Sequence, residues 1–385
     1  MASAVLIQAN ADPLACSCRA PDDVVAVRRR PTNAATASGS PDRRDDAVGQ
    51  GARRTVTRIW LLPLSALMAC TLTFVLWRII ERFQIHDIPN ERSMHAKPLA
   101  VGAGWAVIGC VMVLWPWSSV LPAGQTALIC AATLILAVVG WKDDLTSLSP
   151  LLRLAFQIGV VAICLLSLSD RPLLLGGLAP AWLDRTLTAV AWIWIINLFN
   201  FMDGIDGITG TETVFVCLGY AILAGRLAAP DMSTDLALIL AGAGLGFLVW
   251  NWHPARIILG DVGSTTLGFL IGWLLLDLSF RGHLVAAAIL PMYPLADATC
   301  TLMRRCLTVR QPWKPHRQHF YQRVVLSGLS PPQTVLRIAC LNLLLTALAV
   351  LSLSRPWLAV ICAVVATSGL LLHFASHRAA GEPPQ

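Results

Sequence analysis

Eleven apolar segments follow one another along the chain, and each comes close to the length of about 20 residues that a helix needs to cross a bilayer. Only 13% of the 385 residues are Asp, Glu, Lys or Arg, whereas soluble domains contain roughly a quarter. A chain with so few charges lacks the polar surface of a soluble globule. The segments are 59–80, 99–117, 121–140, 152–169, 187–202, 208–227, 236–252, 265–280, 284–302, 335–353 and 357–375.

We therefore predict an all-α, polytopic integral membrane protein with 10–11 transmembrane helices, formed by residues 58–378. Residues 1–57 are rich in Ala, Arg, Asp, Ser and Pro without a hydrophobic period, which predicts a disordered tail. Residues 379–385 are expected to form a second, short tail. The first residues contain no apolar run of the kind found in signal peptides, so we expect no signal peptide. The 11 cysteines show no spacing typical of a zinc site or a disulfide framework.

Every second connection between the apolar segments is polar and carries a motif, so these connections should share one side of the membrane. They are residues 81–98, 141–151, 203–207, 253–264 and 303–334. Of the 29 Lys and Arg, nine lie in residues 1–58 and five on the opposite connections, which leaves 15 for this side and the C-terminus. The five are Arg171, Arg185, Arg226, Arg281 and Arg355. The positive-inside rule makes the 15-cation side cytoplasmic.

The Arg-rich tail conflicts with this orientation, because the same parity places it outside. Either the tail crosses the membrane, since charge governs long segments only weakly, or translation starts near Val48 or Val56.

The first motif-bearing connection, residues 86–98, mixes His, Asp, Glu, Arg and Lys. This is more than snorkelling at the interface needs, and the set is suited to hold phosphate. A plain basic loop beside the membrane is the alternative.

The second connection, residues 141–151, contains the adjacent acids Asp143 and Asp144. Two neighbouring carboxylates repel each other, and at a membrane surface a divalent cation or a shared proton offsets that repulsion. A solvated turn is the alternative.

The third motif places Asn197, Asn200, Asp203 and Asp206 at intervals of three residues at the end of an apolar segment. If the helix persists, these side chains share one face, and the glycine after each Asp lets a ligand approach the backbone. Amides and acids here are costly unless they are used. A helix-ending turn is the alternative.

The fourth motif runs from Asn251 to Ser264 and contains Asp261 at the start of the next span. A carboxylate beside the N–H groups that begin a helix can bind a metal with fixed geometry. A simple N-cap is the alternative.

The last motif is the basic loop after residue 303, with His316, Arg317 and His319. Clustered Arg and His are natural partners of a diphosphate, and Asp297 in the preceding span is placed to pair with them. Surface histidines are the alternative. Carboxylates for Mg2+, cations for phosphate and an adjoining membrane together indicate phosphoryl transfer between a soluble nucleotide compound and a lipid phosphate.

Five motifs in the same order make residues 60–350 resemble the polyprenyl-phosphate N-acetylhexosamine-1-phosphate transferases, which include the phospho-MurNAc-pentapeptide translocase. The motifs are PNERS-H, G-x-x-DD, N-x-x-N-x-x-DG-x-DG, GD-x-GS and the basic His loop. The form of the His loop is similar to the branch that initiates O-antigen or related surface glycans in lipopolysaccharide and cell-wall biogenesis.

The resemblance implies that a bacterial inner-membrane enzyme transfers a sugar-1-phosphate from a UDP-sugar to undecaprenyl phosphate, giving a lipid-linked diphosphate sugar and UMP. Mg2+ is the implied cofactor, with Mn2+ as a substitute. The branch uses N-acetylated, often 6-deoxy, hexosamines. The lipid bilayer is a further implied partner, nucleic acid is not one, and a homodimer stays open.

The resemblance also implies residue roles. Asp143 and Asp144 would position or deprotonate the lipid phosphate, and Asp261, with Asp144, would bind Mg2+. The nucleotide site would contain Asn200, Asp203 and Asp206, with Asn251 nearby. The diphosphate would contact Lys97, His316, Arg317 and His319.

Three departures from the family pattern concern the nucleotide site and the tail. The usual Pro-Arg-Gly-Gly run is here residues 100–103, Ala-Val-Gly-Ala, which lack the cation. Ile258 replaces an aromatic residue, so it can pack against a uracil but cannot stack on it. The Arg-rich tail has no family counterpart.

Other classes of membrane protein fit less well. An ion-coupled transporter, the main alternative, should carry its acids near the bilayer midplane and show an internal repeat. An intramembrane aspartyl protease needs a Gly at the position of Ile258. A lipid phosphatase needs an Arg/His signature that attacks phosphate, and residues 316–319 could be mistaken for one.

Overall fold

The computed structural model describes residues 58–87, 94, 98–167, 174–175, 179–229, 233–311 and 316–377. All of them belong to the second of two units into which the chain divides, residues 43–385. The predicted tails and Lys97 lie outside the described residues.

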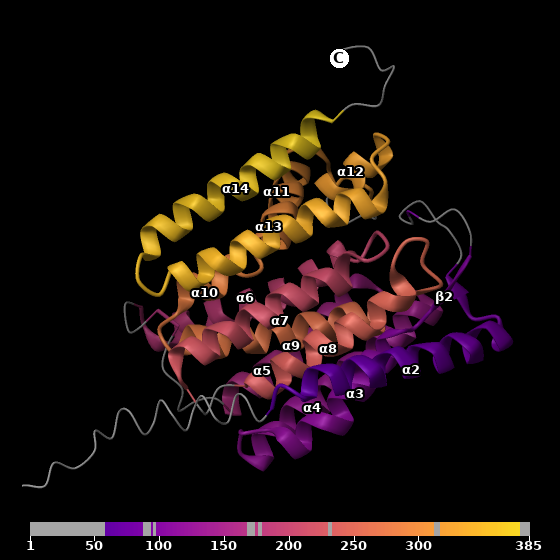
Figure 1. Ribbon diagram of the computed structural model, residues 1–385, viewed down its shortest axis with the longest axis horizontal. Helices are drawn as coiled ribbons and strands as arrows, with labels where there is room; N and C mark the ends of the chain where they lie inside the picture. Colours follow the sequence, from indigo (N-terminus) through magenta and orange to yellow (C-terminus); the bar gives the residue numbers. More distant parts are fainter. Residues whose placement is uncertain are drawn as a thin grey trace, which may run out of the picture. The chain divides into compact units, whose positions relative to one another are not determined.

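Helices account for all eleven predicted apolar segments (Figure 1). Nine of the described helices are long and apolar enough to cross a membrane, and α3 is a shorter apolar helix. The prediction of an all-α polytopic membrane protein is confirmed. The helices are α2 (Leu61–Phe83), α3 (Gly104–Ser118), α4 (Ala123–Thr146), α5 (Pro150–Ser167), α6 (Ala181–Met202), α7 (Ile208–Leu227), α8 (Thr234–Asn251), α9 (Asp261–Phe280), α10 (Leu284–Ile289), α11 (Met292–Thr308), α12 (Phe320–Leu326), α13 (Pro331–Leu351) and α14 (Pro356–Ser376).

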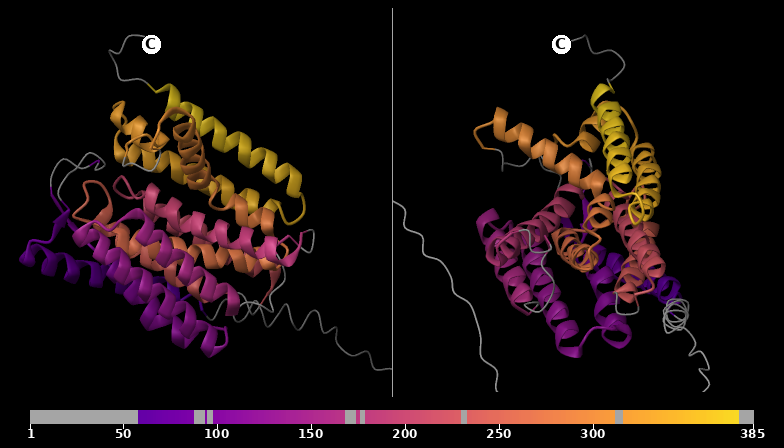
Figure 2. Two further views of the ribbon diagram at one scale, coloured as in Figure 1. Left: turned by 180° about the vertical axis from the view of Figure 1, so that it is seen from behind. Right: turned by 90° about the vertical axis from the view of Figure 1, so that its left-hand side faces the viewer.

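The predicted segment 284–302 is not one continuous helix. It is divided into α10 and α11 at Pro291, which has no N–H to donate and whose ring would clash with the preceding turn. Beyond the break, α11 lies across the direction of α13 and α14 (Figure 2).

A small three-stranded sheet ties the first motif-bearing connection to the fourth. β1 (His86–Asp87) pairs antiparallel with β2 (Leu99–Val101), and β2 pairs in parallel with β3 (Ile257–Ile258). Two of the family departures, residues 100–103 and Ile258, therefore meet here, with Val101 opposite Ile258.

The motif-bearing connections meet at one end of the helix bundle, as the parity of the segments predicts. The backbone N–H of Asp261 donates to Asp144 at 2.7 Å, which brings the end of α4 to the start of α9. Asp206, after α6, accepts a hydrogen bond from the connection after α8 at 3.0 Å. The Tyr321 hydroxyl of α12 donates to the carbonyl of Phe201 at 2.9 Å.

Helix α9 is the most enclosed of the nine candidate spans. Gly268 lets it approach α6 closely, since a Cβ there would lie 2.7 Å from the Cα of Ile196. Gly140 of α4 fits against its first turn, where a Cβ would lie 2.5 Å from the carbonyl oxygen of Asp261. The indole N–H of Trp192 donates to the carbonyl of Phe269 at 2.9 Å. These contacts hold the start of α9 in a fixed position.

Candidate active site

Asp144 caps the N-terminus of α9 from another helix. Its Oδ1 accepts the N–H of Asp261 at 2.7 Å, and its Oδ2 accepts the N–H of Val262 at 3.2 Å. A carboxylate here satisfies N–H groups that have no partner within the helix and interacts favourably with the helix dipole. Gly260, the residue before α9, has φ of +77°, and a Cβ on it would lie 2.6 Å from the Asp144 carboxylate. Asp144 thereby positions Asp261.

Asp143, the neighbour of Asp144 in the sequence, faces Asp261 across an arginine. Arg153 Nη1, from the first turn of α5, donates to Asp143 Oδ2 at 2.5 Å and to Asp261 Oδ2 at 2.9 Å. The second oxygen of Asp143 accepts the N–H of Leu148 at 2.6 Å. Two carboxylates from helices far apart in the sequence therefore share one guanidinium.

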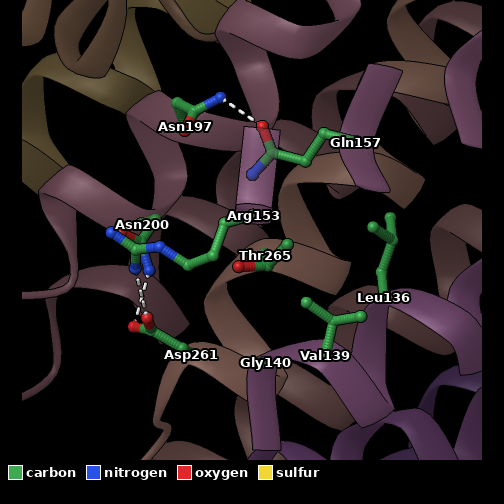
Figure 3. A pocket seen from close by; sticks show the side chains of 9 residues that line it. All are labelled: Leu136, Val139, Gly140, Arg153, Gln157, Asn197, Asn200, Asp261 and Thr265. Atoms are coloured by element: carbon green, nitrogen blue, oxygen red, sulfur yellow. Dashed lines mark hydrogen bonds and ion pairs between the residues drawn. The ribbon is translucent and has the colours of Figure 1, made fainter. Parts of the chain in front are cut away.

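Asn200 completes the surroundings of Asp261. Its Nδ2 donates to Asp261 Oδ1 at 2.7 Å and to Ser264 Oγ at 3.0 Å. One turn earlier on α6, Asn197 donates to Gln157 of α5 at 2.7 Å. A small pocket opens between these polar groups and the apolar wall of α4 (Figure 3). It is lined by Leu136, Val139, Gly140, Arg153, Gln157, Asn197, Asn200, Asp261 and Thr265.

The predicted row of polar residues does not continue past α6. The helix ends at Met202, and Asp203 accepts the hydroxyl of Thr209 at 2.7 Å in the following turn. The prediction that Asp203 and Asp206 extend one helical face is therefore wrong. The row is broken in the turn between the two helices, where Asp203 leaves the helical conformation with ψ of 55° and Gly207 adopts φ of +80°, which suits glycine.

Asp206 turns toward the connection that precedes α9. Its Oδ2 lies 2.7 Å from His253 Nδ1 and accepts the N–H of Ala255 at 3.0 Å. Asn251 links the same two connections, since it accepts the N–H of Gly207 at 2.9 Å and donates to the carbonyl of Ile257 at 3.0 Å. These residues shape the loops on one side of Asp261.

The basic loop is anchored by the buried Asp297, which bears out the predicted pairing. Asp297 lies 3.1 Å from His319 Nδ1 and accepts the N–H groups of Phe320 and Tyr321 at 3.0 and 3.2 Å. The ring of His316 lies beside that of His319, with centroids 5.1 Å apart.

Two arginines in α11 and α12 adjoin this loop. Arg304 donates to the carbonyl of Gln318 at 3.0 Å. Burial, and then the nearby charge of Arg323, lowers the pKa of the Arg304 guanidinium. Positive charges are therefore crowded here, which favours an anion as their partner.

The structure brings Asp143, Asp144, Asn200 and Asp261 into one connected group. The group that sequence reasoning missed is Arg153 with Gln157. They are the only charged residue and the only amide in the segment 152–169, and their spacing of four residues places both on one helix face. That isolated polar pair is the signal that could have found them.

The donor set fits Mg2+ only with help from a substrate. Within the described residues, no group of three or more His, Cys, Asp and Glu is arranged to hold a metal. Asp143 and Asp261 offer two carboxylates, whereas Asp144 turns both oxygens to α9. Mg2+ is usually held by one or two carboxylates together with substrate phosphates. The carboxylates of Asp143 and Asp261 fit this type of coordination.

Comparisons with known proteins point to one enzyme class. Residues 126–279, which run from α4 to α9, match the family described as Glycosyl transferase family 4. The probable undecaprenyl-phosphate N-acetylglucosaminyl 1-phosphate transferase of Bacillus subtilis is 28% identical over 309 residues, 77% of this chain and 85% of the relative.

Two further relatives extend the comparison. The undecaprenyl-phosphate alpha-N-acetylglucosaminyl 1-phosphate transferase of Escherichia coli K12 is 28% identical over 296 residues, 71% of this chain and 78% of the relative. The phospho-N-acetylmuramoyl-pentapeptide-transferase of Moorella thermoacetica is 44% identical over 93 residues, 24% of this chain and 29% of the relative.

Proposed function

Because the chain belongs to the polyprenyl-phosphate N-acetylhexosamine-1-phosphate transferase superfamily, we propose that it transfers N-acetylhexosamine-1-phosphate from a UDP-sugar to undecaprenyl phosphate. In this reaction an oxygen of the lipid phosphate attacks the sugar-bearing phosphorus of the donor. The bond from that phosphorus to the bridging oxygen breaks, and UMP leaves with the oxygen. The products are undecaprenyl-diphospho-sugar and UMP.

The observation that carries this proposal is the meeting of Asp143, Arg153 and Asp261 at the end of three apolar helices. Charged groups at the end of a span are costly unless they are used. The small pocket beside them has one polar and one apolar wall (Figure 3), which suits a phosphate that carries a hydrocarbon chain.

The residues take separate roles in the proposal. Asp143 and Asp261 hold Mg2+, which supplies charge neutralisation to the phosphates when it is bound. Asp144 keeps the start of α9, and with it Asp261, in place. A lipid phosphate monoester is already largely ionised at neutral pH, so the acceptor needs positioning more than it needs a strong base.

The nucleotide and the diphosphate lie on either side of Asp261 in the proposal. Asp203 and Asp206, in the loop that Asn251 ties to β3, line the nucleotide site together with Asn200. Lys97, Arg317 and the two histidines of the basic loop contact the diphosphate, and Asp297 fixes the position of His319.

The motif-bearing end faces the cytoplasm of a bacterial inner membrane in this proposal, because 15 Lys and Arg belong to that side and five to the other. The product then initiates a surface glycan such as O-antigen. The sugar is an N-acetylhexosamine, and a panel of UDP-sugars, 6-deoxy forms included, identifies it.

The test uses membranes that contain the protein and a labelled UDP-N-acetylhexosamine. We expect label to enter a butanol-extractable product only when Mg2+ and undecaprenyl phosphate are both present, with one UMP released per product. Membranes without the protein give the background. Release of inorganic phosphate in place of UMP, or label in the lipid fraction without Mg2+, contradicts the proposal.

A further inference from the structure

Arg153 occupies the place between Asp143 and Asp261 that a divalent cation needs. A single nitrogen, Nη1, lies 2.5 Å from Oδ2 of Asp143 and 2.9 Å from Oδ2 of Asp261. The arginine side chain is 27% exposed, and the two carboxylates are 8% and 22% exposed. Two partly buried carboxylates this close repel each other unless a cation lies between them.

The remaining oxygens of the two acids are already occupied. Asp143 Oδ1 accepts the N–H of Leu148, and Asp261 Oδ1 accepts the amide of Asn200. Each carboxylate is therefore held so that its Oδ2 points to the same nitrogen. A hard divalent cation would use this same pair of oxygens, and its positive charge would repel the guanidinium beside it, so the two compete for the pair.

We propose that Arg153 is a built-in counter-ion of this acidic pair, which competes with the divalent cation and yields the two oxygens when the cation binds with substrate. The proposal rests on the metal site of the proposed function. Arg153 is a positioning residue in this role, because it acts on the metal through the carboxylates.

The surroundings of Arg153 allow such a movement. Its side chain lines the small pocket beside Asp261 (Figure 3). One turn further along α5, Gln157 accepts the amide of Asn197 at 2.7 Å, which holds the helix to α6 while the arginine side chain reorients. A guanidinium released from two carboxylates is well shaped to hold a phosphate through paired hydrogen bonds.

This arrangement couples the metal to the substrate. Without a phosphate nearby, the cation must displace the guanidinium, which then loses both carboxylate partners. With a diphosphate present, the guanidinium gains a new partner, so the same displacement costs less. Arg153 thus disfavours a bound metal in the empty site and favours one in the loaded site.

The experiment measures Mn2+ binding to purified protein in detergent by electron paramagnetic resonance, without substrate. We expect Arg153→Gln to bind Mn2+ about tenfold more tightly than the wild type, a size typical of coupling between two binding events. Arg153→Lys keeps the charge but loses the fork, so its affinity should lie between the two. Lys142→Gln is the matched control, because it removes an exposed cation next to Asp143 in the sequence and should leave the affinity within about twofold.

Three comparisons make the result decisive. Asp261→Asn must lose the Mn2+ signal, which shows that the titrated site is the acidic pair. Unchanged or weaker Mn2+ binding by Arg153→Gln, in protein that elutes and melts like the wild type, overturns the proposal. If Arg153→Gln does not fold, Arg153→Lys decides it, and an affinity equal to that of the wild type overturns it.

The counter-ion proposal and the proposed function can fail separately. Wild-type membranes that form the lipid-linked product, together with unchanged Mn2+ binding by Arg153→Gln, refute only the counter-ion. Tighter binding by that variant, in a protein that forms no lipid-linked product, supports the counter-ion and refutes the transfer reaction.

Discussion

The two ends of α9 each hold an aspartate that contacts an arginine, yet the two contacts are built differently. Near its last turn, Asp277 contacts Arg281 of the same stretch of chain at 3.1 Å and accepts the hydroxyl of Tyr220 at 2.5 Å. At its first residue, Asp261 contacts Arg153, which lies 108 positions away. This second arginine is shared with another acid, Asp143.

The difference shows that burial of charge alone does not mark a site. Asp277 is 2% exposed, and Asp184, at the start of α6, accepts the N–H groups of Leu174 and Leu175 at 2.9 and 2.6 Å. Asp277 and Asp184 accept hydrogen bonds from neighbouring groups of the fold, and these bonds need no ligand. Asp143 and Asp261 instead share one guanidinium from a third helix, α5, which a divalent cation displaces in our proposal.

The largest effect should come from Asp261→Asn. This variant keeps the size of the side chain but removes one of the two carboxylates that face Arg153, so we expect turnover to fall by about a thousandfold or more. Sugar transfer is measured in membranes with equal amounts of inserted protein. Full activity would remove Asp261 from the proposed metal site and would make the two ends of α9 equivalent.

A smaller loss should follow Gly140→Ala. The added Cβ would lie 2.5 Å from the carbonyl oxygen of Asp261 and 2.7 Å from the backbone nitrogen of Val262. The start of α9 must then shift, which we expect to lower turnover about 10- to 100-fold. Gly159→Ala is the matched control, because nothing lies within 4 Å of its added Cβ. Equal activity of the two variants would show that close packing does not position Asp261.

His253→Gln should act more weakly. His253 Nδ1 lies 2.7 Å from Asp206, and its side chain is 42% exposed. Exposed ion pairs contribute little, so we expect the KM for the UDP-sugar to rise by about two- to fivefold while kcat stays near that of the wild type. A fall in kcat with an unchanged KM would place His253 in the chemical step instead of in the loops proposed to line the nucleotide site.

The smallest effect on turnover should come from Asp277→Asn. The amide can still accept the Tyr220 hydroxyl, but the ion pair with Arg281 is lost. We expect the Tm in detergent to fall by a few degrees, about 1–2 kcal/mol of stability, while turnover per folded molecule stays within about twofold. A large loss of turnover without a change in Tm would mean that the far end of α9 takes part in the reaction.

Much of the fold follows from apolar periodicity and from the parity of the connections. The end of the bundle that carries the motifs could be predicted because long apolar segments alternate sides whatever their packing. The break at Pro291 was missed, since a single Pro inside an apolar run either kinks a helix or ends it. The segment 187–202 ends where α6 ends, at Met202, whereas the row of polar residues was wrongly extended past it because a spacing of three residues continues equally well through a turn.

The candidate site was predicted in its members but not in its contacts. Asp143 and Asp261 stand out because acids are rare at the ends of apolar segments. Sequence alone gives no direction to two neighbouring carboxylates, so the turn of Asp144 toward α9 was not foreseen. Arg153 looks like a cation that snorkels to the interface, and only the packing of α5 against α4 and α6 shows its partners.

The order in which the chain is made gives the contact between Asp143 and Arg153 another meaning. These two residues are ten positions apart, on the neighbouring helices α4 and α5, whereas Asp261 follows more than a hundred positions later. This contact needs nothing beyond α5, so it can form during insertion before α9 is made. In that order Asp261 adds one carboxylate to a pair of helices whose charges already have partners.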